Sequence, residues 1–240
     1  MRRWGDEPLS DSRELMRLHV EALFTHDPQG CLIGVNVPNG APAPRFFIGS
    51  TDNGSVVRWR SDVDGDTQRD LEAAAANDQR PLDVAAAPAD ISVYAEILGR
   101  SAPVERTWSG PAFCFPKRLP ATIGAVAITS ENASVLQPLL PAWIPDVDLN
   151  PPVFAVIVDG QAVAVCCSVR RTGAAHEAGV ETVPAFRGQG HAGRAVVAWA
   201  RAVRDMGCVP LYSTLWQNEA SRAVARTLGL IHFGSDLHLM

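Results

Sequence analysis

The stretch TVPAFRGQGHAG, residues 182–193, lies between an apolar strand-like run and a long segment with helical periodicity. Arg187, Gly188, Gly190 and Ala192 satisfy the pattern Arg/Gln-x-x-Gly-x-Gly/Ala. A glycine-rich turn that opens a helix leaves several backbone N–H groups unpaired, and the positive end of the helix dipole lies behind them. Such an arrangement binds phosphate without a charged side chain, so the stretch predicts a diphosphate site.

The segments around this turn predict the order β-β-β-α-β-α-β. Asp159-Gly160 is a hairpin signal between two apolar runs, and Gly179 suggests a bulge in the third strand. Gly207 and Gly229 are expected to end the two helices, the second of which Asn218 caps. The expected strands are 153–158, 162–169, 177–183, 209–215 and 231–239, and the first helix is 189–206. A further helix is expected at 134–140.

The first hundred residues mix helix and strand signals without a recognisable site. A helix capped by Ser12 is expected to run through Leu23, and further helices are expected at 66–76 and 91–98. Strands are expected at 31–37, 45–48 and 56–60. A boundary near residue 105 divides the chain into an N-terminal α/β accessory domain, 1–105, and a second domain, 106–240. One interpretation is that the accessory domain is a degenerate copy of the second domain. In this interpretation, the accessory domain forms one wall of the acceptor site.

Composition narrows the class of protein. The formal net charge is −5, whereas nucleic-acid-binding domains usually carry a basic excess, so no nucleic-acid partner is expected. No run of about 18 apolar residues occurs, and the N-terminus turns polar at once, so neither a membrane span nor a signal peptide is expected. Lys117 is the only lysine beside abundant arginine, which suggests a GC-rich bacterial genome. We therefore expect a cytoplasmic bacterial protein.

The glycines also fit a second phosphate-binding pattern. Gly188, Gly190 and Gly193 spell G-x-G-x-x-G, the fingerprint of dinucleotide-binding folds. That fingerprint requires an acidic residue about 20 positions further on, at the end of the next strand. The corresponding region, 211–215, contains no acid. A nicotinamide-dependent oxidoreductase is therefore only a third hypothesis.

Two motifs resemble the GNAT family, the GCN5-related N-acetyltransferases. Residues 181–192 resemble its motif A, and residues 218–230, with Asn-Glu-Ala-Ser at the start and Leu-Gly-Leu at the end, resemble its motif B. The resemblance covers roughly residues 110–240. It implies an α/β (α+β) fold, a GNAT-like mixed and mostly antiparallel sheet with flanking helices.

The resemblance also implies a cofactor, acetyl-CoA. The backbone of the glycine turn would hold the pyrophosphate, and the strand before it would pair with the pantetheine arm. His191 has a second interpretation as a surface side chain. The cofactor-binding residues that the resemblance implies are Val180, Thr182, Val183, Arg187, Gly188, Gln189, Gly190, His191, Ala192, Gly193, Asn218 and Ser221.

Proton transfer is the part of the chemistry that the motifs leave unassigned. Ala225 occupies the position of the family's usual tyrosine acid, and Ser213 that of a common glutamate base. Direct acyl transfer still requires a neutral amine, so we expect Glu181 as the base and Glu177 as the second choice. Both could instead be solvated strand residues. Tyr212 is interpreted as a core aromatic.

These expectations define an N-acetyltransferase that moves an acetyl group from acetyl-CoA to a primary amine of a small molecule or peptide. The alternative is a non-catalytic acyl-CoA sensor or scaffold, which the missing tyrosine favours. No metal site is expected, because His26 with Asp27, and His232 with Asp236 and His238, lack a metal-ligand spacing. The acceptor and the oligomeric state stay open, with a homodimer as one option.

Overall fold

The computed structural model describes residues 11–77, 91–121 and 124–240. Contacts divide these residues into two compact units, each assembled from separate segments. The turn unit comprises residues 114–212 and 220–231. The terminal unit comprises the described residues up to 113, together with 213–219 and 232–240. The units therefore do not coincide with the segments 1–105 and 106–240, because the C-terminal strand belongs with the N-terminal ones.

The turn unit contains the sheet order β10-β9-β8-β7-β6 among the described residues. All neighbours are antiparallel except β9 and β10, which are parallel. The expected hairpin turn is present, with positive φ at Asp159 and Gly160. The strands are β6 (Ala125–Ile128), β7 (Val153–Val158), β8 (Gln161–Arg171), β9 (Ala175–Thr182) and β10 (Val209–Ser213).

Helices cover both faces of this sheet. On one face, α5 (His191–Asp205) packs against β7, β8 and β9 and buries Trp199 completely. The helix α6 (Glu219–Thr227) follows β10. On the other face lies a cluster that includes Leu136, Leu140 and Val147. Its short helices are η1 (Ala133–Leu136), η2 (Pro141–Trp143) and α4 (Asp146–Leu149), and η3 (Pro184–Phe186) precedes α5.

Two sequence expectations in the turn unit are wrong. The helix expected at 134–140 is one 3₁₀ turn, because Pro138 removes a backbone donor and clashes with the preceding turn. The bulge expected at Gly179 lies in β8, where the register shifts between Ser168 and Arg170. Gly179 nevertheless makes room for this bulge, because a Cβ there would lie 2.0 Å from Cγ1 of Val169, the residue at the register shift.

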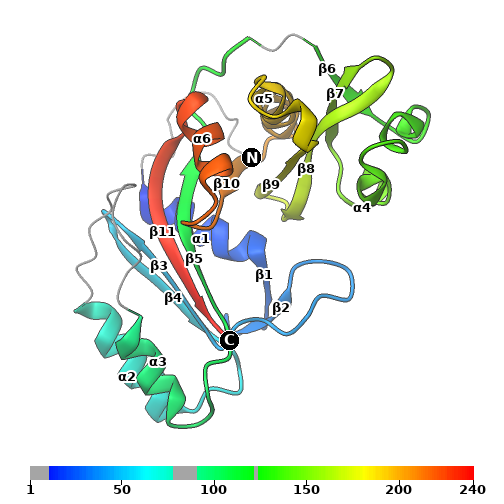
Figure 1. Cartoon of the computed structure of the whole chain (residues 1–240). Coiled ribbons are helices and arrows are strands. Elements are labelled where there is room, and N and C mark those ends of the chain that lie inside the picture. The colour runs from blue at the N-terminus through cyan, green and yellow to red at the C-terminus, as the bar shows by residue number, and fades with distance from the viewer. Residues whose placement is uncertain (1–10, 78–90, 122–123) are drawn as a thin grey trace. The chain divides into compact units, whose positions relative to one another are not determined.

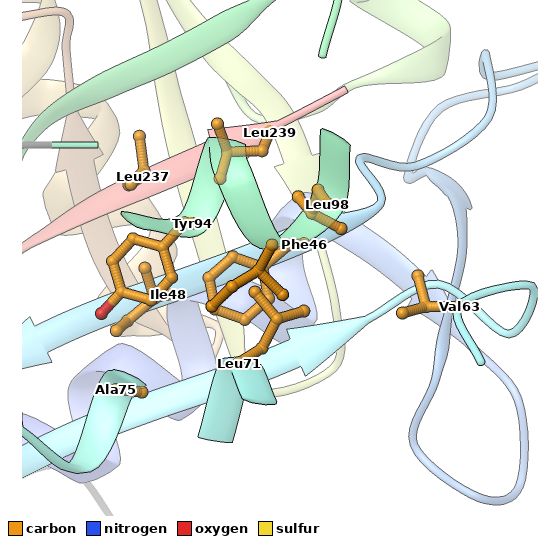
Figure 2. Packing of buried hydrophobic residues seen from close by; sticks show 10 residues of the cluster. Phe46, Ile48, Val63, Leu71, Ala75, Tyr94, Leu98, Leu237 and Leu239 are labelled. Atoms are coloured by element: carbon orange, nitrogen blue, oxygen red, sulfur yellow. The ribbon is translucent and has the colours of Figure 1, made fainter. Parts of the chain in front are cut away.

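The terminal unit has the sheet order β4-β3-β11-β5 among the described residues. A core cluster on one face joins Phe46 and Ile48 of the sheet to Leu71 and Leu98 of two helices, as Figure 2 shows. Those helices, α2 and α3, lie side by side in Figure 1. The elements are α1 (Ser12–Leu23), β1 (Phe24–His26), β2 (Leu32–Val35), β3 (Phe46–Thr51), β4 (Gly54–Trp59), α2 (Gly65–Ala76), α3 (Ser92–Gly99), β5 (Thr107–Cys114) and β11 (Ile231–Leu239).

The helix α1 covers the other face of this sheet. Its N-cap is Asp11 and not Ser12 as expected, because Oδ1 of Asp11 accepts from the amide of Arg13 at 3.0 Å. Met16 fills a groove over two glycines, because a Cβ at Gly49 would lie 2.2 Å from its Sδ and one at Gly234 would lie 2.7 Å from its Cε. The glycines thus allow α1 to pack closely on β3 and β11. None of the described helices is long and apolar enough to cross a membrane.

Candidate functional site

The strands β9 and β10 separate beside the glycine turn. Their parallel pairing ends with Leu211 opposite Glu177, whereas β9 continues to Thr182, bonded on its other edge to β8. One backbone edge of residues 178–182 therefore pairs with no strand among the described residues. A free edge of this kind can pair with an extended ligand.

The glycine turn itself has the backbone conformation of an anion-binding nest. Gly188 and Gly190 have φ of +77° and +75°, and Gly190 is the N-terminal cap of α5. The first helical hydrogen bond comes from the amide of Arg194, so the amides of 188–193 donate no hydrogen bond to any described residue. A Cβ at either of the two glycines would meet nothing within 4 Å. The turn therefore presents unpaired donors to open space at a helix N-terminus.

Gly193 has a different role. A Cβ at this position would lie 3.3 Å from Cδ2 of Leu228, which follows α6. Its missing side chain therefore allows α5 to approach the end of α6. Ala192 is half-buried in the same first turn.

Two buried polar atoms beside the turn lack partners among the described residues. One is Oγ1 of Thr182, and the other is Nδ1 of His191. The interpretation of His191 as a surface side chain is wrong, because it is only 6% exposed. Its Nε2 lies 3.3 Å from the amide oxygen of Gln189. Burial, and then Arg194, lower the pKa of His191, so the ring is neutral at pH 7.

The remaining residues of the predicted cofactor site lie in β9, in the turn and directly before α6. Arg187 folds back so that its Nε donates to the carbonyl of Thr182 at 3.2 Å. Val180 lies on the free-edged part of β9, and the amide of Val183 donates to the carbonyl of Val163 at 2.9 Å. Asn218 immediately precedes α6, where its amide donates to the carbonyl of Leu215 at 3.0 Å.

The two glutamates of β9 have unlike environments. Glu181 is exposed, and Nε1 of Trp143 donates to its Oε2 at 2.5 Å. Glu177 is buried opposite Arg170, so the interpretation of both residues as solvated is wrong for Glu177. Side chains alternate along a strand, so both carboxylates lie on the face away from α5.

The face of β9 toward α5 contains a polar network that the sequence did not reveal. Oγ of Ser168 lies 2.8 Å from Nδ1 of His176 and accepts from Nε1 of Trp199 at 3.0 Å. His176 is buried, although its position at the start of β9, directly after a hairpin turn, would favour an exposed residue. Burial, and then Arg171, lower the pKa of His176 to about 4, so it is neutral.

A hydroxyl pair connects β10 to α6. The hydroxyl of Tyr212 lies 2.5 Å from Oγ of Ser221, and burial raises the pKa of Tyr212 to about 12. Tyr212 is buried, as expected of a core aromatic. Ala225, one turn after Ser221, is buried as well and offers no hydroxyl. No group of three or more metal-ligating side chains suited to a metal ion occurs among the residues that the structure covers.

In this α/β protein, an unpaired strand edge, a glycine nest and a helix N-terminus lie together, an arrangement suited to an extended, phosphate-bearing ligand. Comparisons with known proteins show which family this part of the chain resembles. The GNAT acetyltransferase family model matches residues 154–234, which span β7 to the first part of β11. That segment is similar to GNAT acetyltransferases and contains both motifs, so the resemblance seen in the sequence is confirmed.

Solved structures extend the likeness in fold. A GNAT-family acetyltransferase from Colwellia psychrerythraea covers 98% of this chain and 97% of its own, with a TM-score of 0.51 and 13% identity. A GCN5-related N-acetyltransferase-like protein from Streptococcus suis covers 95% and 99%, with a TM-score of 0.48 and 17% identity. A GNAT-family protein from Novosphingobium aromaticivorans is 20% identical, with a TM-score of 0.45, and the chain spans 65% of its length. No curated protein sequence matches the chain significantly. The GNAT-like fold extends over nearly the whole chain.

Proposed function

We propose that this protein is an acyl-CoA-dependent N-acyltransferase that moves the acetyl group of acetyl-CoA to a primary amine. The observation that carries the proposal is the glycine turn, whose amides at 188–193 donate to no described residue and which follows the free edge of β9. A diphosphate suits the turn, and an extended amide-containing arm suits the strand edge. The family match of residues 154–234 supports the same cofactor.

Different parts of the cofactor would be bound by the glycine turn and by β9. The amides of Gly188 to Gly193 would hold the pyrophosphate, and the positive φ of Gly188 and Gly190 would keep those amides convergent. A bound diphosphate would favour protonation of His191, whose Nδ1 would then donate. Free backbone groups of Val180 to Thr182 would pair with the pantetheine amides.

Acetyl-CoA supplies an activated thioester. Glu181 would accept the proton of the amine directly or through water, and an amide of β9 would polarise the thioester carbonyl. The amine nitrogen would then bond to the carbonyl carbon as the C–S bond breaks, and the thiolate would leave with the electron pair of that bond. Because a thiol of this type has a pKa near 8.5, the thiolate leaves without a strong acid. The hydroxyl of Ser221, held by Tyr212, would donate a hydrogen bond to the cofactor.

Two measurements test this proposal. Isothermal calorimetry should show that CoA binds, and that a nicotinamide dinucleotide neither binds in its place nor displaces it. Thiol release from acetyl-CoA should rise above the hydrolysis background in the presence of some members of a panel of primary amines. Binding of the dinucleotide that CoA does not displace would instead favour the oxidoreductase.

A second function is an acyl-CoA sensor or scaffold. The observation that favours it is Ala225, which places a methyl group where the family's tyrosine hydroxyl is expected. The same experiments separate the two functions, because a sensor binds CoA but gives no thiol release with any amine.

A further inference from the structure

The free edge of β9 is formed by the backbone groups of alternate residues. The amide of Val183 donates to the carbonyl of Val163, so these two residues form a bonded pair of the ladder with β8. Bonded and non-bonded pairs alternate along an antiparallel ladder, and Thr182 lies opposite Ala164 in the next pair. The N–H and C=O groups of Thr182 therefore point away from β8 to the free edge, as do those of Val180.

Arg187 occupies one of these backbone groups. Its Nε donates to the carbonyl oxygen of Thr182 at 3.2 Å, so its guanidinium lies at the free edge. The side chain is exposed, and this is the one hydrogen bond that it makes to any described residue. An extended ligand that pairs with the edge needs the same oxygen as an acceptor. The guanidinium and such a ligand therefore compete for Thr182.

The other donors of Arg187 are available to a phosphate. Arg187 directly precedes the glycine turn, and its two Nη groups donate to no described residue. There is open space at the turn, since a Cβ at Gly188 or Gly190 would meet nothing within 4 Å. A guanidinium presents a fork of donors that matches phosphate oxygens, and its bonds to an anion are stronger than a bond to a neutral carbonyl. A diphosphate at the turn would therefore draw Arg187 away from Thr182.

This competition makes the two parts of a ligand depend on each other. A ligand without a phosphate has to displace Arg187 from Thr182 into water, which costs one hydrogen bond. A ligand with a diphosphate gives Arg187 new and stronger bonds as it leaves the strand edge. The phosphate thus favours binding of the extended arm, although the two parts contact different groups of the protein.

We propose that Arg187 is a specificity-determining residue, which hinders the pairing of phosphate-free thioesters with β9 and admits thioesters that carry a diphosphate. The diphosphate binds the guanidinium, and the carbonyl of Thr182 becomes available to the amide-containing arm. This inference rests on the proposed function, because it concerns the same site and the same cofactor.

Backbone amide NMR of the full chain tests the proposal with pantetheine, which has the arm but no phosphate. The amides of Val180 and Thr182 should shift with a saturable dependence on its concentration. In Arg187→Ala, the affinity for pantetheine should rise roughly threefold to tenfold, because the competing donor is absent. Inorganic pyrophosphate should raise the affinity for pantetheine in the wild-type protein but not in this variant. The affinity for pyrophosphate itself should fall in Arg187→Ala, and a merely structural role would not give these opposite changes.

The matched control is Arg194→Ala, which removes an equal charge next to the same turn. Nη2 of Arg194 donates to the carbonyl of Gln189 at 3.3 Å and not to β9, so the affinity for pantetheine should stay unchanged. An equal gain in this control, no gain in Arg187→Ala, or no saturable shift at Val180 and Thr182 in either protein would overturn the proposal. Calorimetry with CoA separates the two levels of inference. A wild-type protein that does not bind CoA contradicts the proposed function, whereas CoA binding without these effects removes only the role of Arg187.

Discussion

The indole Nε1–H of Trp143 donates a 2.5 Å hydrogen bond to Oε2 of Glu181. Trp143 lies in η2, which packs with the buried cluster of Leu136, Leu140 and Val147. The bond therefore fixes an exposed carboxylate of β9 to a well-packed segment of the same unit. A base held in one orientation transfers protons more efficiently than a mobile one.

We expect Glu181→Gln to lower the rate of amine-dependent thiol release about 10²-fold or more, because the base is lost. Trp143→Phe should lower kcat roughly tenfold, about 1.4 kcal/mol, because only the orientation is lost. The affinity for CoA should stay unchanged in both, as measured by calorimetry. Glu177→Gln is the control, because Glu177 is buried near the start of β9. An equal loss in the Glu177 variant would remove the assignment to Glu181.

Gly190→Ala should weaken CoA binding about tenfold, because a left-handed conformation costs a residue with a Cβ about 1–2 kcal/mol and the amides would turn away. Gly160→Ala is the matched control. Gly160 has φ of +77°, and a Cβ there also meets nothing within 4 Å, but it lies in the β7–β8 turn. Calorimetry should show a normal affinity for CoA in this control and a lower melting temperature in both variants. If both variants lose affinity equally, the glycine turn is not the phosphate site.

Gly193→Ala should change the stability of the protein by less than about 1 kcal/mol, because crowding against Leu228 at 3.3 Å offsets the higher helix propensity of alanine. In the Leu228→Ala background, Gly193→Ala should be less destabilising than in the wild-type protein, because the shorter side chain at residue 228 leaves room for the new Cβ. Urea denaturation of the four members of this double-mutant cycle measures the coupling. Additive effects would show that the two positions do not compete for space.

The pH dependence of stability should reveal His176. Its folded-state pKa is about 4, below the ordinary value of 6.5, so the unfolded chain binds the proton more tightly. This contribution is fully present above about pH 6.5 and is lost as the pH falls toward 4, by up to about 3 kcal/mol. His176→Asn should lessen the loss of stability between these values in denaturant titrations. An unchanged slope would show that His176 keeps an ordinary pKa in the folded protein.

The sequence predicted the elements whose own residues determine them. The helix α5 has strong amphipathic periodicity, and the glycines around it mark its ends, so its position was correct to within two residues. The strand β5 was missed, because Gly110 and Pro111 argue against a strand. Gly110 is required there by its neighbour, since a Cβ would lie 1.7 Å from the carbonyl oxygen of Thr214. That contact joins residues too distant in sequence for any local pattern to reveal.

The candidate site also contains residues that the sequence predicted and residues that it did not. The turn at 188–193 is a local motif, and its conformation followed from the positions of its glycines. The partner of Glu181 was not predictable, because Trp143 lies 38 residues earlier in the chain. Trp143 also belongs to a 3₁₀ helix, which no pattern in the sequence predicted. Burial of His176 was also missed, because no spacing in the sequence places Trp199 over it.

The position of β11 between β3 and β5 has a consequence for biosynthesis. The core of the terminal unit takes Leu237 and Leu239 from this strand, whereas its other residues are made much earlier. During translation, the edges of β3 and β5 that pair with β11 therefore stay unpaired until residue 239 has emerged from the ribosome. Unpaired strand edges of this kind recruit other chains. A chain shortened before Ile231 should therefore aggregate, although it retains the glycine turn and α5.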